Sequence, residues 1–154
     1  DSAPNRTVYM QICKSDGSTQ NLKAQTQQKA VGEWSHFIFQ LNSTSGQATS
    51  GLSSFENGRW TKTLAFVGTW NPATDPLLFF ADVGNATAGY VGLKDFILLN
   101  RALTDVEARN LYLYDEAPAG TVVAEYKFNG DLTDSSGNGN NATLTSGAPV
   151  YLDF

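Results

Sequence analysis

The sequence predicts an all-β domain with one short helix. Its 154 residues are 41% hydrophobic, 12% aromatic and only 16% charged, with 14 glycines. This composition is typical of strands joined by turns, and it argues against a helical bundle or a disordered chain. Apolar and polar residues alternate with a period of two in several segments, whereas a helical period is found in one stretch, residues 104–112. The length suffices for one domain with a substantial core.

The strands are expected where β-prone residues alternate or form short apolar runs. In residues 6–14, for example, Val8, Met10 and Ile12 share one face of a half-buried strand. In chain order, these patterns predict strands at residues 6–14, 21–26, 32–41, 63–69, 77–81, 90–99 and 122–128.

Turns and loops are expected where glycine and small polar residues gather. Asp16-Gly17 and Asn57-Gly58 each separate two strand-like segments, and Asn-Gly is the stronger hairpin signal. Residues 42–54 are rich in Ser, Thr and Gly, which predicts a loop.

The helix follows directly from the strand at residues 90–99, so residues 90–112 form the stretch around which the chain is organised. Thr104 and Glu107 stand three apart and predict a capping box, in which each side chain binds the backbone N–H of the other residue. A helix of about two turns has too little apolar surface to be stable alone, so we expect it to lie against a sheet.

Three segments resemble a known family. Residues 92–112 read G-x-x-D-F-I-L-L-N-R-A-L-T-D-x-E-x-x-N-L-Y, and the earlier segments G-E-W-S-H-F-I-F and F-E-N-G stand in the expected order. Together they resemble bacterial laminin-G-like domains of the concanavalin A-like lectin/glucanase superfamily. The resemblance implies an antiparallel β-sandwich of jelly-roll type, and a non-catalytic adhesion or carbohydrate-binding module. One sandwich hosts many functions, so the resemblance indicates fold more than activity.

The C-terminal segment resembles the opening of the same family rather than its end. After an expected linker at residues 115–120, the chain reads VVAEYKFNGDLTDSSGNGNNA. Either a second domain starts here, or the chain is a circular permutant. We favour a single domain over residues 1–154, in which residues 121–154 supply the family's opening strand, because neighbouring termini tolerate permutation. This strand, residues 122–128, should pair with residues 90–99 of the same chain, or of a second copy by strand swapping.

Composition argues against several partners. The net charge is −5 and no basic run occurs, so nucleic acid and anionic membranes are poor partners. No apolar run is long enough to span a membrane. Cys13 is the single cysteine, which excludes an internal disulfide and predicts a small core residue.

The sequence predicts that the protein is not an enzyme. Glycosidases of this superfamily place alternating carboxylates on one strand, and no expected strand here has that pattern. Asp105 and Glu107 stand two apart on the expected helix, a spacing that does not bring them together. His36 is the single histidine and is expected to be a structural strand residue.

Residues 134–140 (DSSGNGN) admit two interpretations. They offer oxygen ligands at alternate positions, as half of a calcium loop does, with Asp131, Asp134 and Asn138 as candidate ligands. However, the twelfth position is Thr145 rather than the glutamate of an EF-hand loop. The favoured interpretation is a structural turn in which Asp and Asn side chains bind local backbone.

A sugar site is predicted around two loops that flank residues 77–81. An exposed aromatic ring among amide and carboxylate acceptors suits glycan binding, although tryptophans also fill cores. The candidate residues in these loops are Trp70, Asn71, Asp75, Asp82 and Asn85, and Trp60 beside the Asn57-Gly58 hairpin is a further candidate. The sequence thus favours a secreted or cell-surface module whose partner is a glycan or an extracellular protein. The alternative is a structural or protein-binding spacer without a sugar site.

Overall fold

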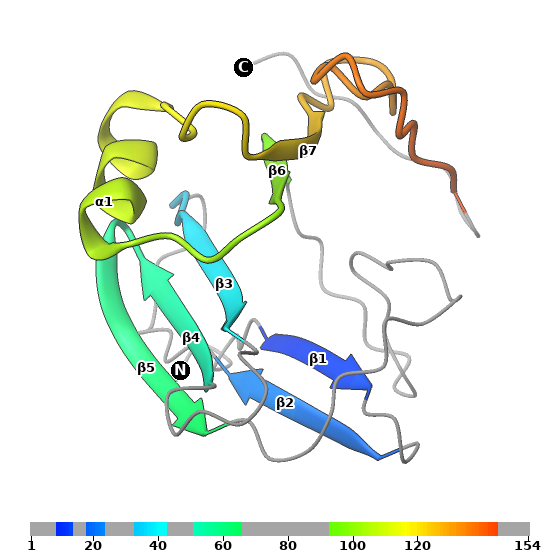
Figure 1. The fold of residues 1–154 in the computed structure, drawn as a ribbon. Helices are drawn as coiled ribbons and strands as arrows, with labels where there is room; N and C mark the ends of the chain where they lie inside the picture. Colours follow the sequence, from blue (N-terminus) through cyan, green and yellow to red (C-terminus); the bar gives the residue numbers. More distant parts are fainter. Residues whose placement is uncertain (1–8, 14–17, 24–32, 43–50, 66–92, 145–154) are drawn as a thin grey trace, which may run out of the picture. The chain divides into compact units, whose positions relative to one another are not determined.

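The computed structural model describes residues 9–13, 18–23, 33–42, 51–65 and 93–144, and Figure 1 shows their fold. These residues form mostly strands in antiparallel sheets, with one helix, which confirms the β-rich class that the sequence predicts. The chain divides into two compact units, of which the first contains β1 to β5 and α1, and the second contains β6 and β7. The elements are β1 (Tyr9–Cys13), β2 (Thr19–Lys23), β3 (Phe37–Asn42), β4 (Gly51–Glu56), β5 (Arg59–Ala65), β6 (Phe96–Leu99), α1 (Asp105–Tyr114) and β7 (Val122–Tyr126).

The first unit contains the hairpin β1–β2 and the sheet β3–β4–β5, in which β4 is the central strand (Figure 1). Leu52 on β4 is fully buried and forms the core of this sheet. Leu41 and Leu64 lie directly opposite it on the neighbouring strands, and Phe39 packs against it as well. Full burial of one such side chain contributes about 1.5–3 kcal/mol to stability, so Leu52 holds the three strands together.

The hairpin between β4 and β5 is the two-residue turn that the sequence predicts at Asn57-Gly58. Both residues have positive φ, 50° and 72°, the combination that a type I′ turn requires and that Asn-Gly adopts readily. Asn57 also binds the residue before β3: its N–H donates to the His36 carbonyl, and its Oδ1 accepts from the His36 N–H, both at 2.9 Å. The turn is therefore held to the residue that directly precedes β3.

A β-bulge interrupts the pairing of β4 with β5. Ser54 pairs with Lys62 and Phe55 with Trp60, so Thr61 is the extra residue on β5. The Thr61 hydroxyl donates to the Ser54 carbonyl at 3.0 Å and lies 2.9 Å from the Ser54 hydroxyl. These contacts satisfy the hydroxyl of Ser54, which is fully buried.

Helix α1 begins with the predicted capping box. The Glu107 N–H donates to Thr104 Oγ1 at 3.3 Å, and the Thr104 N–H donates to Glu107 Oε2 at 2.9 Å. Ala108 and Leu111 are buried on one side of the helix. The helix ends at Asp115, whose left-handed backbone lets its N–H bind the Leu111 carbonyl at 3.1 Å.

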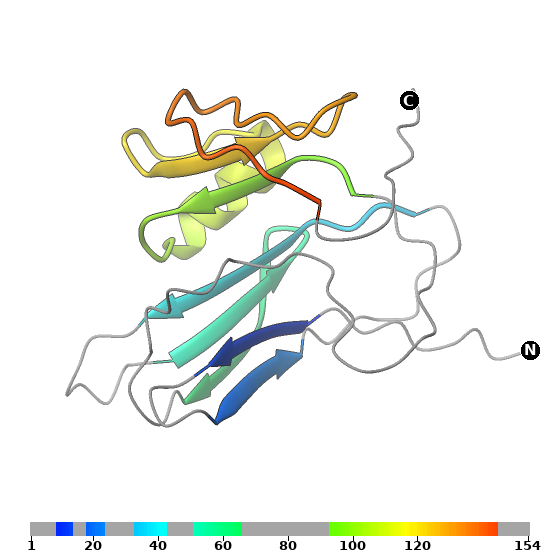
Figure 2. The same ribbon diagram turned by 90° about the vertical axis from the view of Figure 1, so that its right-hand side faces the viewer.

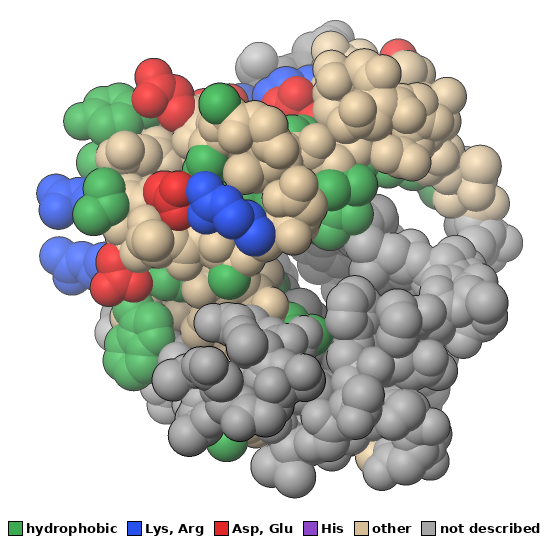
Figure 3. Space-filling view, viewed as in Figure 1, with side chains coloured by type: hydrophobic (Ala, Val, Ile, Leu, Met, Phe, Trp, Pro, Cys, Tyr) green, Lys and Arg blue, Asp and Glu red, His purple; other side chains and the backbone are tan. Residues whose placement is uncertain are grey.

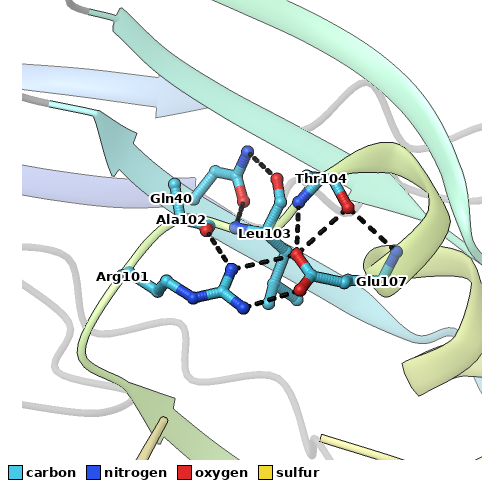
Figure 4. A network of polar contacts seen from close by, with 6 residues as sticks. All are labelled: Gln40, Arg101, Ala102, Leu103, Thr104 and Glu107. Carbon is cyan, nitrogen blue, oxygen red and sulfur yellow. Dashed lines mark hydrogen bonds and ion pairs between the residues drawn. The ribbon is translucent and has the colours of Figure 1, made fainter. Parts of the chain in front are cut away.

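The start of α1 is held to the sheet by the side-chain amide of Gln40 on β3 (Figure 4). The Leu103 N–H donates to Gln40 Oε1 at 2.9 Å, and Gln40 Nε2 donates to the Leu103 carbonyl at 3.2 Å. Because neighbouring residues on a strand point to opposite faces, Gln40 lies on the face opposite Phe39 and Leu41. The helix therefore packs on the face of the sheet away from the Leu52 cluster, which agrees with the expectation that it lies against a sheet.

The second unit contains the pair of antiparallel strands β6 and β7, which lie side by side in Figure 2. Phe96 pairs with Tyr126 and Leu98 with Ala124, and their ladder continues where the Asn100 N–H donates to the Thr121 carbonyl at 2.9 Å. The predicted pairing of the strand after the linker with the strand before the helix is confirmed.

One sequence expectation is wrong. The loop expected at residues 42–54 contains the first part of β4, where Gly51 to Ser54 are paired on both sides. The serine-rich composition indicates a loop. In the sheet, however, Thr61 on β5 binds the hydroxyl and the carbonyl of Ser54, and composition alone does not predict such a partner.

Several element ends also differ from the expectation. Residues 33–36 and 93–95 precede β3 and β6 without strand pairing, and α1 extends to Tyr114 rather than 112. Asp95 has a φ of 52°, which an extended strand does not allow, so β6 begins only after it. The expected strand at residues 77–81 lies outside the described residues.

The turn at Gly58 gives a direct test of this packing. We expect Gly58→Ala to lower the free energy of unfolding by about 2–4 kcal/mol, since it combines a left-handed backbone with an overpacked contact. A Cβ at residue 58 would lie 2.8 Å from Cδ1 of Tyr112. Chemical denaturation measures the loss.

Gly120→Ala is the matched control. Its φ of 71° nearly equals the 72° of Gly58, but no atom lies within 4 Å of its would-be Cβ. Its cost should be the backbone component alone, about 1–2 kcal/mol. Equal losses in the two variants would contradict the contact between Gly58 and Tyr112.

Candidate functional site

The structure describes one of the six predicted sugar-binding residues. Trp60 on β5 is 56% exposed, so its indole is accessible, as a stacking role requires. The other five, Trp70, Asn71, Asp75, Asp82 and Asn85, lie outside the described residues. Their role stays a prediction from the sequence.

A hollow of about 250 Å³ lies between the β4–β5 turn and α1. We call it the hairpin–helix hollow, and its lining residues are Asn57, Gly58, Arg59, Arg109, Tyr112 and Leu113. Figure 3 shows basic side chains at the edge of the molecule where this turn and α1 lie. The hollow therefore combines two guanidinium groups with an aromatic ring and an amide.

The ring of Tyr112 forms one wall of the hollow. It packs directly on Gly58, where a glycine is needed because any Cβ would meet the ring. Its ring centroid lies 5.7 Å from that of His36, with the two planes tilted by 42°. Tyr112 is still 42% exposed, so part of the ring is held in place while part faces solvent.

His36 is half-buried beside this wall. Burial lowers the pKa of its imidazole below the usual value, and the Asp115 carboxylate raises it by a smaller amount. Its Nδ1 is buried and has no hydrogen-bond partner among the described residues. The neutral ring suits a packing role, as the sequence predicts, but His36 lies directly before β3 rather than on the strand where the sequence places it.

Two other cations of the described chain, Arg101 and Lys127, are engaged in ion pairs. Arg101 binds Glu107 with a shortest distance of 2.6 Å (Figure 4), and Lys127 lies 2.7 Å from Glu125 and 3.6 Å from Asp95. The bond from Arg101, together with the Thr104 N–H, lowers the pKa of Glu107 to about 2. This carboxylate holds the helix start and is not a proton donor at neutral pH.

The hydrogen-bond network of the second unit centres on one carboxylate, that of Asp134, which is only 7% exposed. Its Oδ1 accepts from the N–H groups of Glu125 and Ser136, and its Oδ2 accepts from the N–H of Asn140, each at 2.9 Å. These bonds hold the pKa of Asp134 well below its usual range. The turn is thus folded around a buried charge.

Side-chain amides then fasten the same turn to β7. Asn138 Nδ2 donates to the carbonyls of Val122 and Val123 at 3.0 and 3.1 Å. Asn140 Nδ2 donates to the Val123 carbonyl at 2.9 Å, and the Tyr126 hydroxyl donates to the Asn140 carbonyl. Asp and Asn side chains bind local backbone here, as the structural interpretation of the sequence predicts.

The three candidate calcium ligands are in the same turn but have different surroundings. Asp134 is engaged with backbone N–H groups, Asn138 directs its amide nitrogen to β7, and exposed Asp131 accepts the Thr133 N–H at 2.9 Å. Within the described ranges, no three His, Cys, Asp or Glu side chains gather as metal ligands would. Calcium binding stays a prediction.

Comparisons with protein-family models, curated proteins and solved structures find no match for this chain. Among the described elements, no helix has the length and apolar character needed to cross a bilayer.

The sequence did not reveal the hairpin–helix hollow. The sequence predicts a turn at Asn57-Gly58 and a helix that contains Arg109, but nothing in the linear order places them together. Arg109 and Tyr112 stand three apart, and such residues are neighbours on a helix surface. This spacing is the sequence signal for a shared helix surface, but it does not say which strand or turn packs beside that surface.

Asp134 makes stability depend on acidity. Because its folded pKa is below the unfolded value of about 3.9, its contribution is complete above that value and is lost as pH falls through the folded pKa. We expect the melting temperature of the wild type to fall below about pH 4. Asp134→Asn should have a lower melting temperature at pH 7 and a smaller loss on acidification.

Asp131→Asn is the matched control, because this exposed carboxylate in the same turn accepts one backbone N–H in the described structure. Its melting profile between pH 2 and 7 should follow that of the wild type closely, on the order of a degree or two. An Asp134→Asn profile parallel to the wild type would contradict the buried-charge turn.

Proposed function

We propose that this chain is a non-catalytic carbohydrate-binding or adhesion module, secreted or displayed at a cell surface. The observation that carries the proposal is the 56% exposure of Trp60 on an antiparallel sheet. Sugar hydroxyls exchange water for protein hydrogen bonds at small net gain. The apolar face of a sugar stacked on an indole supplies the remaining affinity. An accessible indole on a strand therefore supports sugar binding.

The proposal includes a fold, a single laminin-G-like sandwich of jelly-roll type with a permuted chain. The pairing of β6 with β7 supports it, because β6 belongs to the family's closing motif and β7 to its opening motif. The turn around Asp134 follows β7 as the opening motif requires. Residues 121–154 then supply the first strand of the sandwich.

The described carboxylates with strongly shifted pKa support a non-catalytic role. Glu107 and Asp134 both have a lowered pKa, and in each the cause is hydrogen bonds that hold backbone or a helix start. A glycosidase requires one carboxylic acid whose pKa is raised, so that it can protonate the leaving group. Neither carboxylate meets this requirement.

A spacer that binds protein instead of sugar is the second candidate function. Helix α1 exposes Val106, Leu113 and Tyr114, at 68%, 48% and 66%. Aromatic and aliphatic side chains of this kind are common at protein interfaces. This surface is what favours the second candidate.

A glycan array with Trp60→Ala tests the sugar proposal. We expect the wild type to bind a defined set of glycans, and Trp60→Ala to weaken that binding at least tenfold, about 1.4 kcal/mol. Trp34→Ala is the matched control, since Trp34 is 53% exposed in the same unit. Trp70→Ala tests the loop predicted from the sequence. Equal losses in the Trp60 and Trp34 variants would contradict a stacking site at Trp60.

The same array and a thermal melt, each with and without calcium, separate calcium binding from the structural turn and sugar binding from the protein-binding spacer. If Asp131, Asp134 and Asn138 hold calcium, the metal must raise the melting temperature by mass action. An unchanged melting temperature at millimolar calcium leaves the structural turn as the role of these residues. Silence of the wild type on the whole array, in both conditions, would favour the protein-binding spacer.

A chain that ends at Gly120 tests the permuted fold. This truncation removes β7 and the Asp134 turn, so β6 loses its partner strand. We expect cooperative thermal unfolding to be lost, because unpaired strand edges and exposed core residues cannot be compensated elsewhere. A truncated chain that melts like the full chain would show that residues 121–154 are not part of the fold.

A further inference from the structure

We propose that the hairpin–helix hollow binds the carboxylate of an acidic sugar, such as a uronic acid. This inference rests on the proposed function and names the sugar class and its site. The hollow presents Arg59 from β5 and Arg109 from α1, together with Tyr112. A planar guanidinium matches a planar carboxylate in a bidentate pair, and an aromatic ring suits the apolar face of a sugar.

The two arginines are available for a ligand. Among the described residues, no ion pair or hydrogen bond engages the side chain of either one, whereas Arg101 and Lys127 are both paired. The carboxylates nearest in sequence to these two arginines are those of Glu56, which faces Arg59 across the hairpin, and Asp105, one helical turn before Arg109. Neither carboxylate forms an ion pair with these arginines.

The walls of the hollow are preorganised. Asn57 is fixed by its two bonds to the His36 backbone, and its Nδ2 remains as a donor. Tyr112 is fixed against Gly58 on one side and contacts His36 on the other. A site whose parts are held before binding loses less conformational entropy on binding, which favours recognition of a small ligand.

Size and net charge restrict the ligand. The volume of about 250 Å³ lies below the roughly 300–1,000 Å³ of sites for drug-sized ligands, which suits one sugar ring. A polyanion such as nucleic acid would be repelled by the net charge of −5. A single carboxylate on a sugar needs only the two local arginines. The chemistry therefore favours an acidic monosaccharide unit over a highly charged polymer.

Titration of the full chain with three probes tests the inference. The probes are methyl glucuronide, methyl glucoside and sodium acetate at equal ionic strength, and amide chemical-shift changes measure binding. We expect methyl glucuronide to bind at least tenfold more tightly than either other probe. Equal affinity for the glucoside would overturn the role of the carboxylate, and equal affinity for acetate would overturn the role of the sugar ring.

Variants locate the site. Arg59→Gln and Arg109→Gln should each weaken glucuronide binding at least tenfold while melting like the wild type, because both side chains are exposed. Lys94→Gln is the charge-matched control, an exposed cation of the second unit, and should change the affinity less than twofold. Equal effects of all three variants would indicate only nonspecific attraction and overturn the site.

The outcomes separate this inference from the proposed function. Array binding that is lost in Trp60→Ala but unchanged in both arginine variants would retain the carbohydrate-binding module and overturn the hollow as its site. Arginine-dependent acetate binding without any glycan binding would overturn both the sugar class and the carbohydrate-binding function. Arginine-dependent binding of the glucuronide alone supports both.

Discussion

The first unit depends on the side-chain amide of Gln40, which binds both backbone groups of Leu103. Two such hydrogen bonds contribute about 1–3 kcal/mol in net terms, and they fix the chain one residue before the N-cap of α1. The capping box and the ion pair between Arg101 and Glu107 then determine where the helix starts. Tyr112, two turns later, meets Gly58 because the helix start is held in this position.

A different constraint organises the second unit. A carboxylate that is buried without partners is strongly unfavourable, so Asp134 is tolerated only because three backbone N–H groups surround it. This requirement closes the turn and aligns it with β7. In each unit, one polar side chain therefore binds backbone N–H or C=O groups that have no hydrogen-bond partner within a helix or strand.

Local sequence signals predicted the features whose causes are local. The Asn57-Gly58 turn and the capping box of Thr104 with Glu107 depend on residues within three positions of each other, and both are confirmed. The loop expected at residues 42–54 was wrong where β4 begins, because Ser54 is satisfied by Thr61 on another strand. For the predicted sugar site, Trp60 is exposed, and the loop residues stay predictions.

By itself, the sequence determined the β-rich class and the start of the helix that the described residues contain, and the resemblance of two segments to one family predicted the pairing of β6 with β7. The class and the helix start follow from periodicity and from short-range capping. Only the tertiary structure decided which residues share a surface. The hairpin–helix hollow exists because Gln40 and Gly58 position α1 beside the β4–β5 turn. Contacts such as that between Gln40 and Leu103, 63 positions apart, leave no periodic signal along the chain.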